Sequence, residues 1–228
     1  MPEDEMITNE KKMAANSAAK LIKDGMIIGI GTGSTANFVI QSVAKRIKDE
    51  GLKIIAVPTS YETELLAIKN KIPLTSLSIN PALDLAIDGA DQVDKNLFTI
   101  KGKGGAHTRE KVVSMSAKKF VVCIDETKIV DVLFESIPIE VIPYAKDLVE
   151  KEIRGLGGIP KLRKAQRKIG PVISENGNII IDSDFGEIKD PKKLSSQISS
   201  FAGVVEHGIF TNLTEVHIGK RDGIEIIS

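Results

Sequence analysis

Short apolar segments alternate with helical patterns early in the chain, and this order constrains the fold more than any other feature. Apolar runs at residues 26–30, 53–57 and 85–87 predict buried strands. Between them, apolar side chains recur with helical spacing at residues 36–47 and 61–70. A β-α-β-α-β order is typical of a parallel sheet with right-handed crossovers. We therefore expect an α/β fold built on a parallel sheet.

The core of this fold has to be aliphatic. Apolar residues make up 42% of the chain, but aromatic residues make up only 4% and Trp is absent. Strands rich in Ile, Val, Leu and Ala suit a parallel sheet that is covered on both faces. Further elements expected in this part of the chain are a helix at residues 9–23, a hairpin around 95–96, a helix at 107–118 and a strand at 120–124.

The pattern changes near Ser136, where prolines begin to separate shorter elements. The elements expected there are a strand or strand–turn segment at residues 159–165, a hairpin at 172–182 that turns at 176–178, and a helix at 192–201. Closing strands near residues 206–210, 215–218 and 224–227 are expected to rejoin the first sheet. We therefore predict a main domain at residues 1–135 plus 205–228 and a small α+β domain at residues 136–204.

Composition argues against several classes of protein. Lys plus Arg equals Asp plus Glu, at 31 each, which disfavours a nucleic-acid-binding or membrane-surface protein. No apolar run reaches the ~18 residues of a membrane span, and the polar first residues are unlike a signal peptide. The single cysteine, Cys123, lies in a predicted buried strand, so a disulfide scaffold or a cysteine-based metal site within one chain is excluded. A cytoplasmic location is the default expectation.

A glycine-rich loop at residues 31–35, Gly-Thr-Gly-Ser-Thr, joins the first strand to a helix. Glycines allow a ligand to approach the backbone, and the amides at a helix start favour an anion. With Ala36 the loop also matches the dinucleotide pattern G-x-G-x-x-A, but the second strand ends without the acidic residue that would hold a ribose. A dinucleotide site is therefore disfavoured. A tight turn capped by Ser34 or Thr35 is the structural alternative.

Two carboxylates follow the strand at residues 85–87, in the string Asp88-Gly89-Ala90-Asp91. Such groups could bind sugar hydroxyls or take part in proton transfer. Two acids also suggest Mg²⁺, but no adjacent His or further acid cluster strengthens a metal site. A solvated turn capped by Asp is the structural alternative.

A third cluster, at residues 101–111, again places glycines before a helix. Lys101 offers a positive charge for a phosphate or a developing oxyanion. Glu110 lies near the start of the helix, where it could be a general base, although a carboxylate stabilised by the helix dipole is the structural alternative. No P-loop string G-x-x-x-x-G-K-[ST] occurs. Because ligands collect at the carboxyl ends of parallel strands and each cluster follows an apolar strand, we expect all three to meet in one site.

Taken together, these clusters resemble the type A family of ribose-5-phosphate isomerases. The resemblance rests on the strings Gly31-Thr-Gly-Ser-Thr-Ala36, Asp88-Gly-Ala-Asp91, Lys101-Gly-Lys-Gly-Gly-Ala-His-Thr-Arg-Glu-Lys111, Ile124-Asp-Glu-Thr-Lys128, Pro138-Ile-Glu-Val-Ile-Pro143 and Gly155-Leu-Gly-Gly158. Their order and spacing extend the resemblance over nearly the whole chain. It implies a Rossmann-like main domain with a smaller α+β domain, and catalysis without a metal or any other cofactor.

The resemblance also implies an activity: conversion of D-ribose 5-phosphate to D-ribulose 5-phosphate and back through a cis-enediolate, in the non-oxidative branch of the pentose phosphate pathway. Glu110 would move the proton between C1 and C2. Asp88, Asp91 and Lys101 would handle hydroxyl protons, ring opening and enediolate charge. The substrate-binding residues would be Thr32, Gly33, Ser34, Thr35, Asp88, Gly89, Ala90, Asp91, Lys101, Gly102, Lys103, Gly104, Lys128 and Lys11. Because Lys12 is adjacent to Lys11, the sequence leaves open which of these two lysines contacts the phosphate. The ligand would be a small sugar phosphate, with no nucleic acid or membrane partner, and the chain would form a homodimer or homotetramer.

Two other functions stay open at this point. Some transcription regulators carry a non-catalytic sugar-phosphate-sensing domain similar to this fold, but they need a DNA-binding module in front of it. Only about eight residues precede the first expected helix, and the net charge is zero. An acyl-CoA transferase-like enzyme on a related fold would use a Glu nucleophile and form a covalent thioester, which hydroxylamine would trap.

Overall fold

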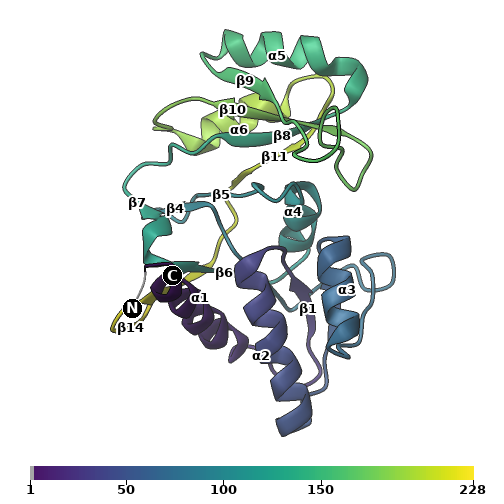
Figure 1. The fold of residues 1–228 in the computed structure, drawn as a ribbon, viewed down its shortest axis with the longest axis vertical. Coiled ribbons are helices and arrows are strands. Elements are labelled where there is room, and N and C mark those ends of the chain that lie inside the picture. Colours follow the sequence, from purple (N-terminus) through teal and green to yellow (C-terminus); the bar gives the residue numbers. More distant parts are fainter. Residues whose placement is uncertain (1–2) are drawn as a thin grey trace. The chain divides into compact units, whose positions relative to one another are not determined.

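The computed structural model of the chain describes residues 3–228, which fold into two compact units (Figure 1). The first unit comprises the residues up to Ala90, Arg109–Ile129 and Asn212–Ser228, and the second comprises Asp91–Thr108 and Val130–Thr211. The predicted domains, 1–135 with 205–228 and 136–204, have different boundaries. Residues 91–108, 130–135 and 205–211 belong to the second unit, although the sequence pattern assigned them to the main domain. The limits of the domains themselves stay a prediction.

A six-stranded sheet forms the centre of the first unit, in the order β14-β13-β6-β3-β1-β2. Its strands are β1 (Ile27–Ile30), β2 (Ile55–Pro58), β3 (Leu85–Asp88), β6 (Phe120–Asp125), β13 (Glu215–Lys220) and β14 (Gly223–Ile227). All neighbours pair in parallel except β13 and β14, which are antiparallel. The expected α/β fold with a parallel sheet is therefore confirmed.

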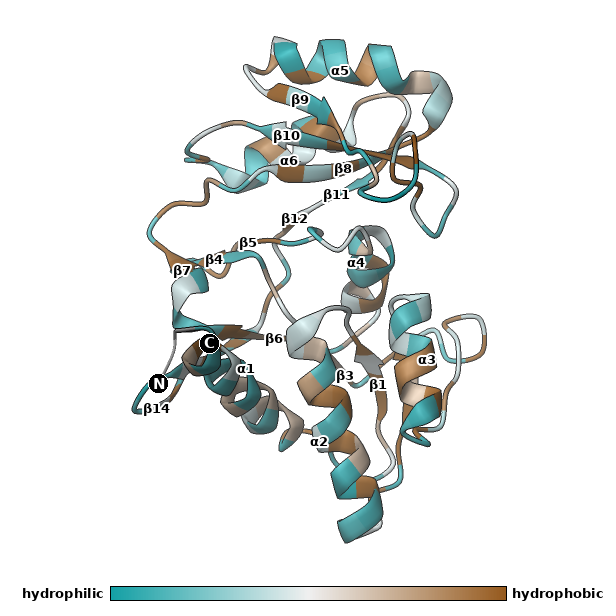
Figure 2. Ribbon diagram, in the orientation of Figure 1, coloured by the Kyte–Doolittle hydropathy of each residue, from teal (hydrophilic) through white to brown (hydrophobic). Residues whose placement is uncertain are grey.

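Helices pack against this sheet through small and aliphatic side chains. They are α1 (Glu3–Ala19), α2 (Ser34–Glu50), α3 (Tyr61–Lys69) and α4 (His107–Met115). Hydrophobic and hydrophilic residues alternate along α2, as expected of a helix with one buried face (Figure 2). This helix ends at Gly51, whose φ of 71° is the left-handed conformation that glycine adopts readily. The core between α1, α2 and the sheet includes Ala14, Ala18, Val39 and Ile40.

The second unit contains a four-stranded antiparallel sheet in the order β11-β8-β10-β9. Its strands are β8 (Ile137–Val141), β9 (Ile159–Leu162), β10 (Ile179–Asp184) and β11 (Val204–His207), and its helices are α5 (Lys146–Gly155) and α6 (Pro191–Ser199). A smaller sheet has the order β12-β5-β4-β7, from β12 (Ile209–Phe210), β5 (Thr99–Ile100), β4 (Gln92–Asp94) and β7 (Ile129–Val130). The short helices η1 (Glu126–Lys128) and η2 (Pro143–Ala145) complete the elements. The hairpin expected around residues 95–96 is confirmed by the antiparallel pair of β4 and β5.

The hairpin expected at 172–182 forms over a short stretch: an antiparallel bridge joins Ile173 to Ile179 across the turn at 176–178, and β10 then pairs with β8 and β9. One expectation about strand pairing is wrong. The strands at 215–218 and 224–227 do join the first sheet, but residues 206–210 contribute to β11 and β12, in the sheets of the second unit.

Within residues 3–228, no helix is both long and apolar enough to cross a membrane.

Candidate active site

Three polar loops lie at one edge of the parallel sheet in the first unit. They follow β1, β3 and β6, which are adjacent in the sheet and run in the same direction. Adjacent parallel strands bring their carboxyl ends to one edge, so residues 31–35, Asp88 and residues 125–128 gather there. The cluster that begins at Lys101 is not one of these three loops. It follows β5, which belongs to an antiparallel sheet of the second unit, so the expectation that this cluster follows a strand of the parallel sheet is wrong.

A glycine and two backbone amides fix Asp88 at this edge. The side chain is buried, and its Oδ1 atom accepts hydrogen bonds from the amides of Thr32 (3.2 Å) and Gly89 (2.7 Å). A Cβ atom at Gly31 would lie only 1.9 Å from this oxygen. Only glycine therefore leaves room for the carboxylate beside the end of β1.

The hydroxyl of Thr32 forms hydrogen bonds within the protein. It lies 2.7 Å from Oγ of Ser60, 2.8 Å from Oγ1 of Thr59 and 3.1 Å from Oγ1 of Thr63. This network ties the glycine loop to the start of α3. The exposed Ser34 and the start of α2, where no side chain caps the helix, are the parts of the loop suited to an anionic ligand.

Thr35, Gly89 and Ala90 shape the same edge. Thr35 is buried, and a Cβ atom at Gly89 would lie 3.4 Å from its Cβ, so the two residues pack closely. Ala90 is half-buried and is the last residue of this segment of the first unit. These residues therefore bring the loops after β1 and β3 together. The exposed Gly33 has a φ of 108°, which glycine tolerates best.

The loop after β6 and the helix α1 each bring a lysine to the edge. Nζ of Lys11, in α1, lies 3.8 Å from Oδ2 of Asp125, the last residue of β6, whereas Lys12 is exposed. Asp125 also caps η1 by accepting a hydrogen bond from the amide of Thr127, and Lys128 ends that short helix. Of the two adjacent lysines in α1, Lys11 is therefore the one that contacts the end of β6, at the edge where the loops gather.

Glu10 is a buried acid near the same loop. Burial raises its pKa, and the negative charges of Glu126 and Asp125 raise it further. These two effects both act against the charged form of Glu10.

Glu110 lies in the first turn of α4 and is buried. The positive end of the helix dipole stabilises a carboxylate at such a position. The preceding residue, Arg109, places its guanidinium carbon 5.0 Å from the centroid of the Tyr61 ring, which joins the start of α4 to α3. The structure therefore gives Glu110 a buried position on a helix that is fixed by a neighbouring contact.

Lys101 is a buried cation in the second unit. Its amide donates to the carbonyl oxygen of Gly208 (2.9 Å), and its ammonium lies 5.6 Å from the centroid of the Phe210 ring. A Cβ atom at Gly208 would lie 2.2 Å from the carbonyl oxygen of Lys101, so the two backbones touch. The strand at 209–210, which the sequence assigned to the other sheet, thus supports this lysine.

The glycine loop after Lys101 contacts Asp91 within the same unit. The amide of Lys103 donates to Oδ2 of Asp91 (3.0 Å), and its ammonium pairs with Glu135 (2.8 Å). Gly102 has a φ of 107°, and a Cβ atom there would lie 2.8 Å from the Cβ of His107. Gly104 is exposed, with open space around it.

Glu140 is a buried acid that the sequence analysis missed. Its carboxylate accepts hydrogen bonds from Thr108 (2.5 Å), Ser174 (2.8 Å), Asn176 (3.1 Å) and Asn178 (2.7 Å). Burial alone raises its pKa, but these four donors outweigh burial and the pKa is lowered. Thr108 and Glu140 both belong to the second unit, so this hydrogen-bond cluster lies within it. A charged residue within the apolar run 137–142 was the available signal.

Across residues 3–228, no group of three or more His, Cys, Asp and Glu side chains is arranged to hold a metal ion. The two acids at 88 and 91 thus lack a third such ligand among the described residues. Cys123 is buried in β6, and burial raises the pKa of its thiol, which disfavours the nucleophilic thiolate.

Comparison with known proteins identifies close relatives. The family model described as ribose 5-phosphate isomerase A (phosphoriboisomerase A) matches residues 55–223. A ribose-5-phosphate isomerase A from Methanosarcina acetivorans is 54% identical over 220 residues, which cover 96% of this chain and 94% of the relative.

Solved structures agree with this match. The structure of ribose 5-phosphate isomerase A from Methanocaldococcus jannaschii superposes with a TM-score of 0.92 at 45% identity, covering 95% of this chain and 97% of the other. A D-ribose-5-phosphate isomerase in complex with phospho-erythronic acid superposes with a TM-score of 0.94 at 42% identity, covering 100% and 99%. The fold is therefore that of these isomerases.

Proposed function

Because the chain belongs to the ribose 5-phosphate isomerase A family, we propose that it converts D-ribose 5-phosphate to D-ribulose 5-phosphate and back, with Glu110 as the base. The observation that carries the proposal is the shared edge of the parallel sheet. The loops after β1, β3 and β6 bring a helix start suited to an anion, an acid and one lysine there, and α1 adds a second lysine. A sugar phosphate needs such a cradle for its phosphate and a base for its reacting carbons.

The phosphate end of the substrate is assigned to the first unit. Ser34 and the start of α2 supply hydroxyl and amide donors, and the helix dipole favours the dianion. Lys128 and Lys11 add positive charge from the loop after β6 and from α1. A related D-ribose-5-phosphate isomerase was solved in complex with phospho-erythronic acid, which supports a phosphate-bearing ligand for the family.

The reacting end requires a base and groups that stabilise charge on oxygen. The Glu110 carboxylate removes the proton from C2 of the open-chain aldose, and the electrons of that bond form the C1–C2 double bond of the cis-enediolate. Lys101 stabilises the charge that develops on O1. Return of the proton to C1, together with transfer of the hydroxyl proton from O2 to O1, gives the ketose with its carbonyl at C2. Asp88 and Asp91 serve as the acids that move the hydroxyl protons and open the sugar ring.

A coupled assay with ribose 5-phosphate tests the proposal directly. We expect turnover of ribose 5-phosphate and almost none of free ribose, since the phosphate cradle contributes binding energy that the free sugar cannot use. Equal turnover of the two sugars would contradict the assigned phosphate site. The acyl-CoA transferase alternative predicts a covalent thioester that hydroxylamine traps, and the isomerase predicts none. The sensor alternative is set aside, because the family consists of enzymes.

The wider setting follows from the same proposal. The reaction belongs to the non-oxidative branch of the pentose phosphate pathway, in the cytoplasm, and no cofactor is required.

We expect a homodimer or homotetramer, because several large apolar side chains of the second unit are exposed in one chain. They include Tyr144 (98% exposed), Ile159 (70%) and Leu148 (47%).

A further inference from the structure

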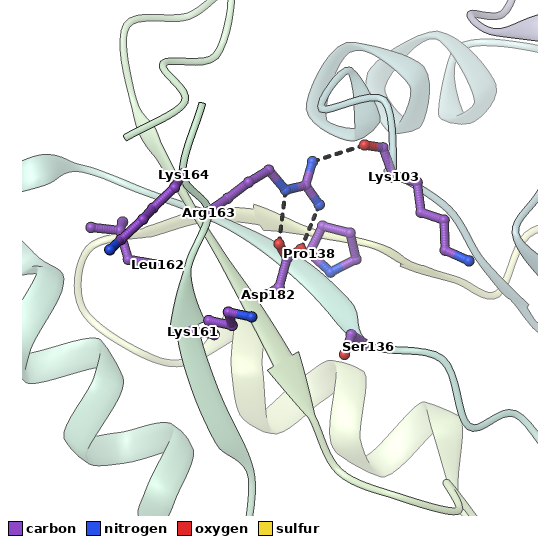
Figure 3. Close-up of a pocket in the computed structure, with 8 residues that line it drawn as sticks. All are labelled: Lys103, Ser136, Pro138, Lys161, Leu162, Arg163, Lys164 and Asp182. Carbon is purple, nitrogen blue, oxygen red and sulfur yellow. Dashed lines mark hydrogen bonds and ion pairs between the residues drawn. The ribbon is translucent and has the colours of Figure 1, made fainter. Parts of the chain in front are cut away.

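Arg163 connects the sheet of the second unit to the loop that follows Lys101. It comes directly after β9, and its guanidinium points toward the loop backbone (Figure 3). Nη1 donates hydrogen bonds to the carbonyl oxygens of Gly102 and Lys103, each over 3.1 Å. A long side chain that binds two consecutive carbonyls restricts the orientation of both peptide groups.

Asp182 aligns this guanidinium. Nε of Arg163 lies 2.9 Å from Oδ2 of Asp182 in β10, and Nη2 lies 2.5 Å from Oδ1. Two parallel bonds between a planar guanidinium and a carboxylate fix the plane of the arginine, which a lysine ammonium cannot reproduce. We call the contact of Arg163 with Asp182 and with the carbonyls of Gly102 and Lys103 the clamp. Because β9 and β10 are paired strands, the clamp is built on a rigid part of the unit.

The loop is held from both sides. Arg163 binds its carbonyl oxygens, while the amide of Lys103 donates to Asp91 (3.0 Å). The carbonyl of Gly102 also accepts from the amide of Gly105 (2.9 Å), which closes a tight turn. The residue directly before this turn is Lys101. Movement of the turn would therefore displace both Lys101 and the amide of Lys103 that binds Asp91.

We infer that Arg163 is a positioning residue for the isomerase: it holds the loop at residues 102–103 so that Lys101 and Asp91 keep their reactive positions. Asp182 acts through Arg163, as the group that orients the guanidinium. The inference rests on the proposed function, since it assigns Arg163 a role in that reaction. It adds two residues outside every motif that carries the family resemblance.

A different explanation is that Arg163 only adds positive charge that attracts an anionic substrate. It lines a cavity of about 610 Å³ together with Lys161 and Lys164, both exposed cations that come from the same segment. In Figure 3 the side chains of these two lysines do not take part in the contact with the loop. They are therefore matched controls: removing either one removes charge from the cavity and leaves the clamp intact.

Steady-state kinetics of Arg163→Ala, Arg163→Lys, Asp182→Asn, Lys161→Ala and Lys164→Ala separate the two explanations. We expect kcat to fall about 10- to 100-fold in both Arg163 variants, because small displacements of catalytic groups have effects of this order, with KM within about threefold of wild type. Asp182→Asn should show a smaller loss of kcat, and both lysine variants should stay near wild type. Full activity in Arg163→Lys, or an equal loss in Lys161→Ala, would overturn the inference.

Hydrogen exchange of the ligand-free protein tests the clamp without using activity. Amides in residues 102–105 should exchange at least about tenfold faster in Arg163→Lys than in wild type, and at an unchanged rate in Lys164→Ala. Loss of kcat with unchanged exchange would reject a positioning role. A wild-type protein that does not isomerise ribose 5-phosphate would refute the proposed function instead, whatever the exchange result. If Arg163→Ala does not fold, Arg163→Lys and Asp182→Asn decide the question.

Discussion

Gly31 and Asp88 show how closely backbone and carboxylate approach each other at the edge of the sheet. The carboxylate lies where the side chain of any other residue at position 31 would begin. The acid is thus positioned by the absence of a side chain as well as by the amides that bind it.

Gly31→Ala should therefore reduce activity more than stability. The new methyl group would displace Asp88, so we expect kcat for ribose 5-phosphate to fall about 10- to 100-fold, with a loss of stability of about 1–3 kcal/mol from overpacking. Gly155→Ala is the matched control, because a Cβ atom there meets nothing within 4 Å. Comparable kcat values for the two variants would show that the position of Asp88 does not matter.

Glu140 predicts a dependence of stability on pH. Its pKa is lowered in the folded protein, so it stabilises the fold above the unfolded pKa of about 4.3, and this stability is lost as the pH falls through the lower, folded pKa. Glu140→Gln should lower the melting temperature at pH 7 and flatten its acid dependence, since hydrogen bonds to a charged group contribute about 1.5–3 kcal/mol each.

The control for this prediction is Glu187→Gln, an exposed acid in the same unit. Its melting curve should match that of the wild type at every pH. If Glu140→Gln unfolds with the same acid profile as the wild type, Glu140 is not the group that titrates.

Sequence reasoning identified glycines and acids in strings but missed Arg163 and Glu140. Arg163 lies in a basic segment of the kind that is usually solvated, and Glu140 is a single charge in an apolar strand. Their partners are 19 to 61 residues away in the sequence for Arg163 and 32 to 38 for Glu140. Only the folded chain brings them together, so local patterns could not predict the contacts.

At the scale of elements, the loops after β1, β3 and β6 lie at one edge because their strands are adjacent and parallel. Under the proposed function, neutralising one of the lysines assigned to the phosphate should weaken binding of substrate without changing the chemical step.

Lys128→Ala tests this expectation. A lost charge-assisted hydrogen bond of about 1.5–3 kcal/mol corresponds to a KM for ribose 5-phosphate about 10- to 100-fold higher, while kcat stays within a few-fold. Lys11→Ala should act in the same direction, and Lys12→Ala, which removes an exposed neighbour, should have no effect. An unchanged KM in Lys128→Ala would remove Lys128 from the phosphate site.

Elements with apolar periodicity were predictable, and those without it were not. The sequence indicated α2 and its end at Gly51, because the spacing and the glycine agree. It missed the first turns of α1, where residues 3–8 are mainly polar, and it missed α5, which follows a proline-rich stretch. Pairing partners such as β12 with β5 depend on contacts distant in sequence, which local patterns do not contain.

At the scale of the whole molecule, we expect an oligomer. Light scattering at micromolar concentration should give a mass of at least twice 24.7 kDa, because association would bury apolar side chains such as Tyr144 and Ile159. A mass near 24.7 kDa would show that these side chains remain exposed and that the chain acts as a monomer.

The central claim is that one carboxylate, Glu110, moves the proton between two carbons. It is tested most directly by Glu110→Gln, which keeps size and shape but removes basicity, compared with wild type in an assay of ribose 5-phosphate conversion. General-base catalysis contributes about 10²–10⁴-fold, so we predict a loss of kcat of at least about 100-fold with substrate binding retained. A kcat close to that of the wild type would contradict the account, and Asp88 or Asp91 would then be the candidate base.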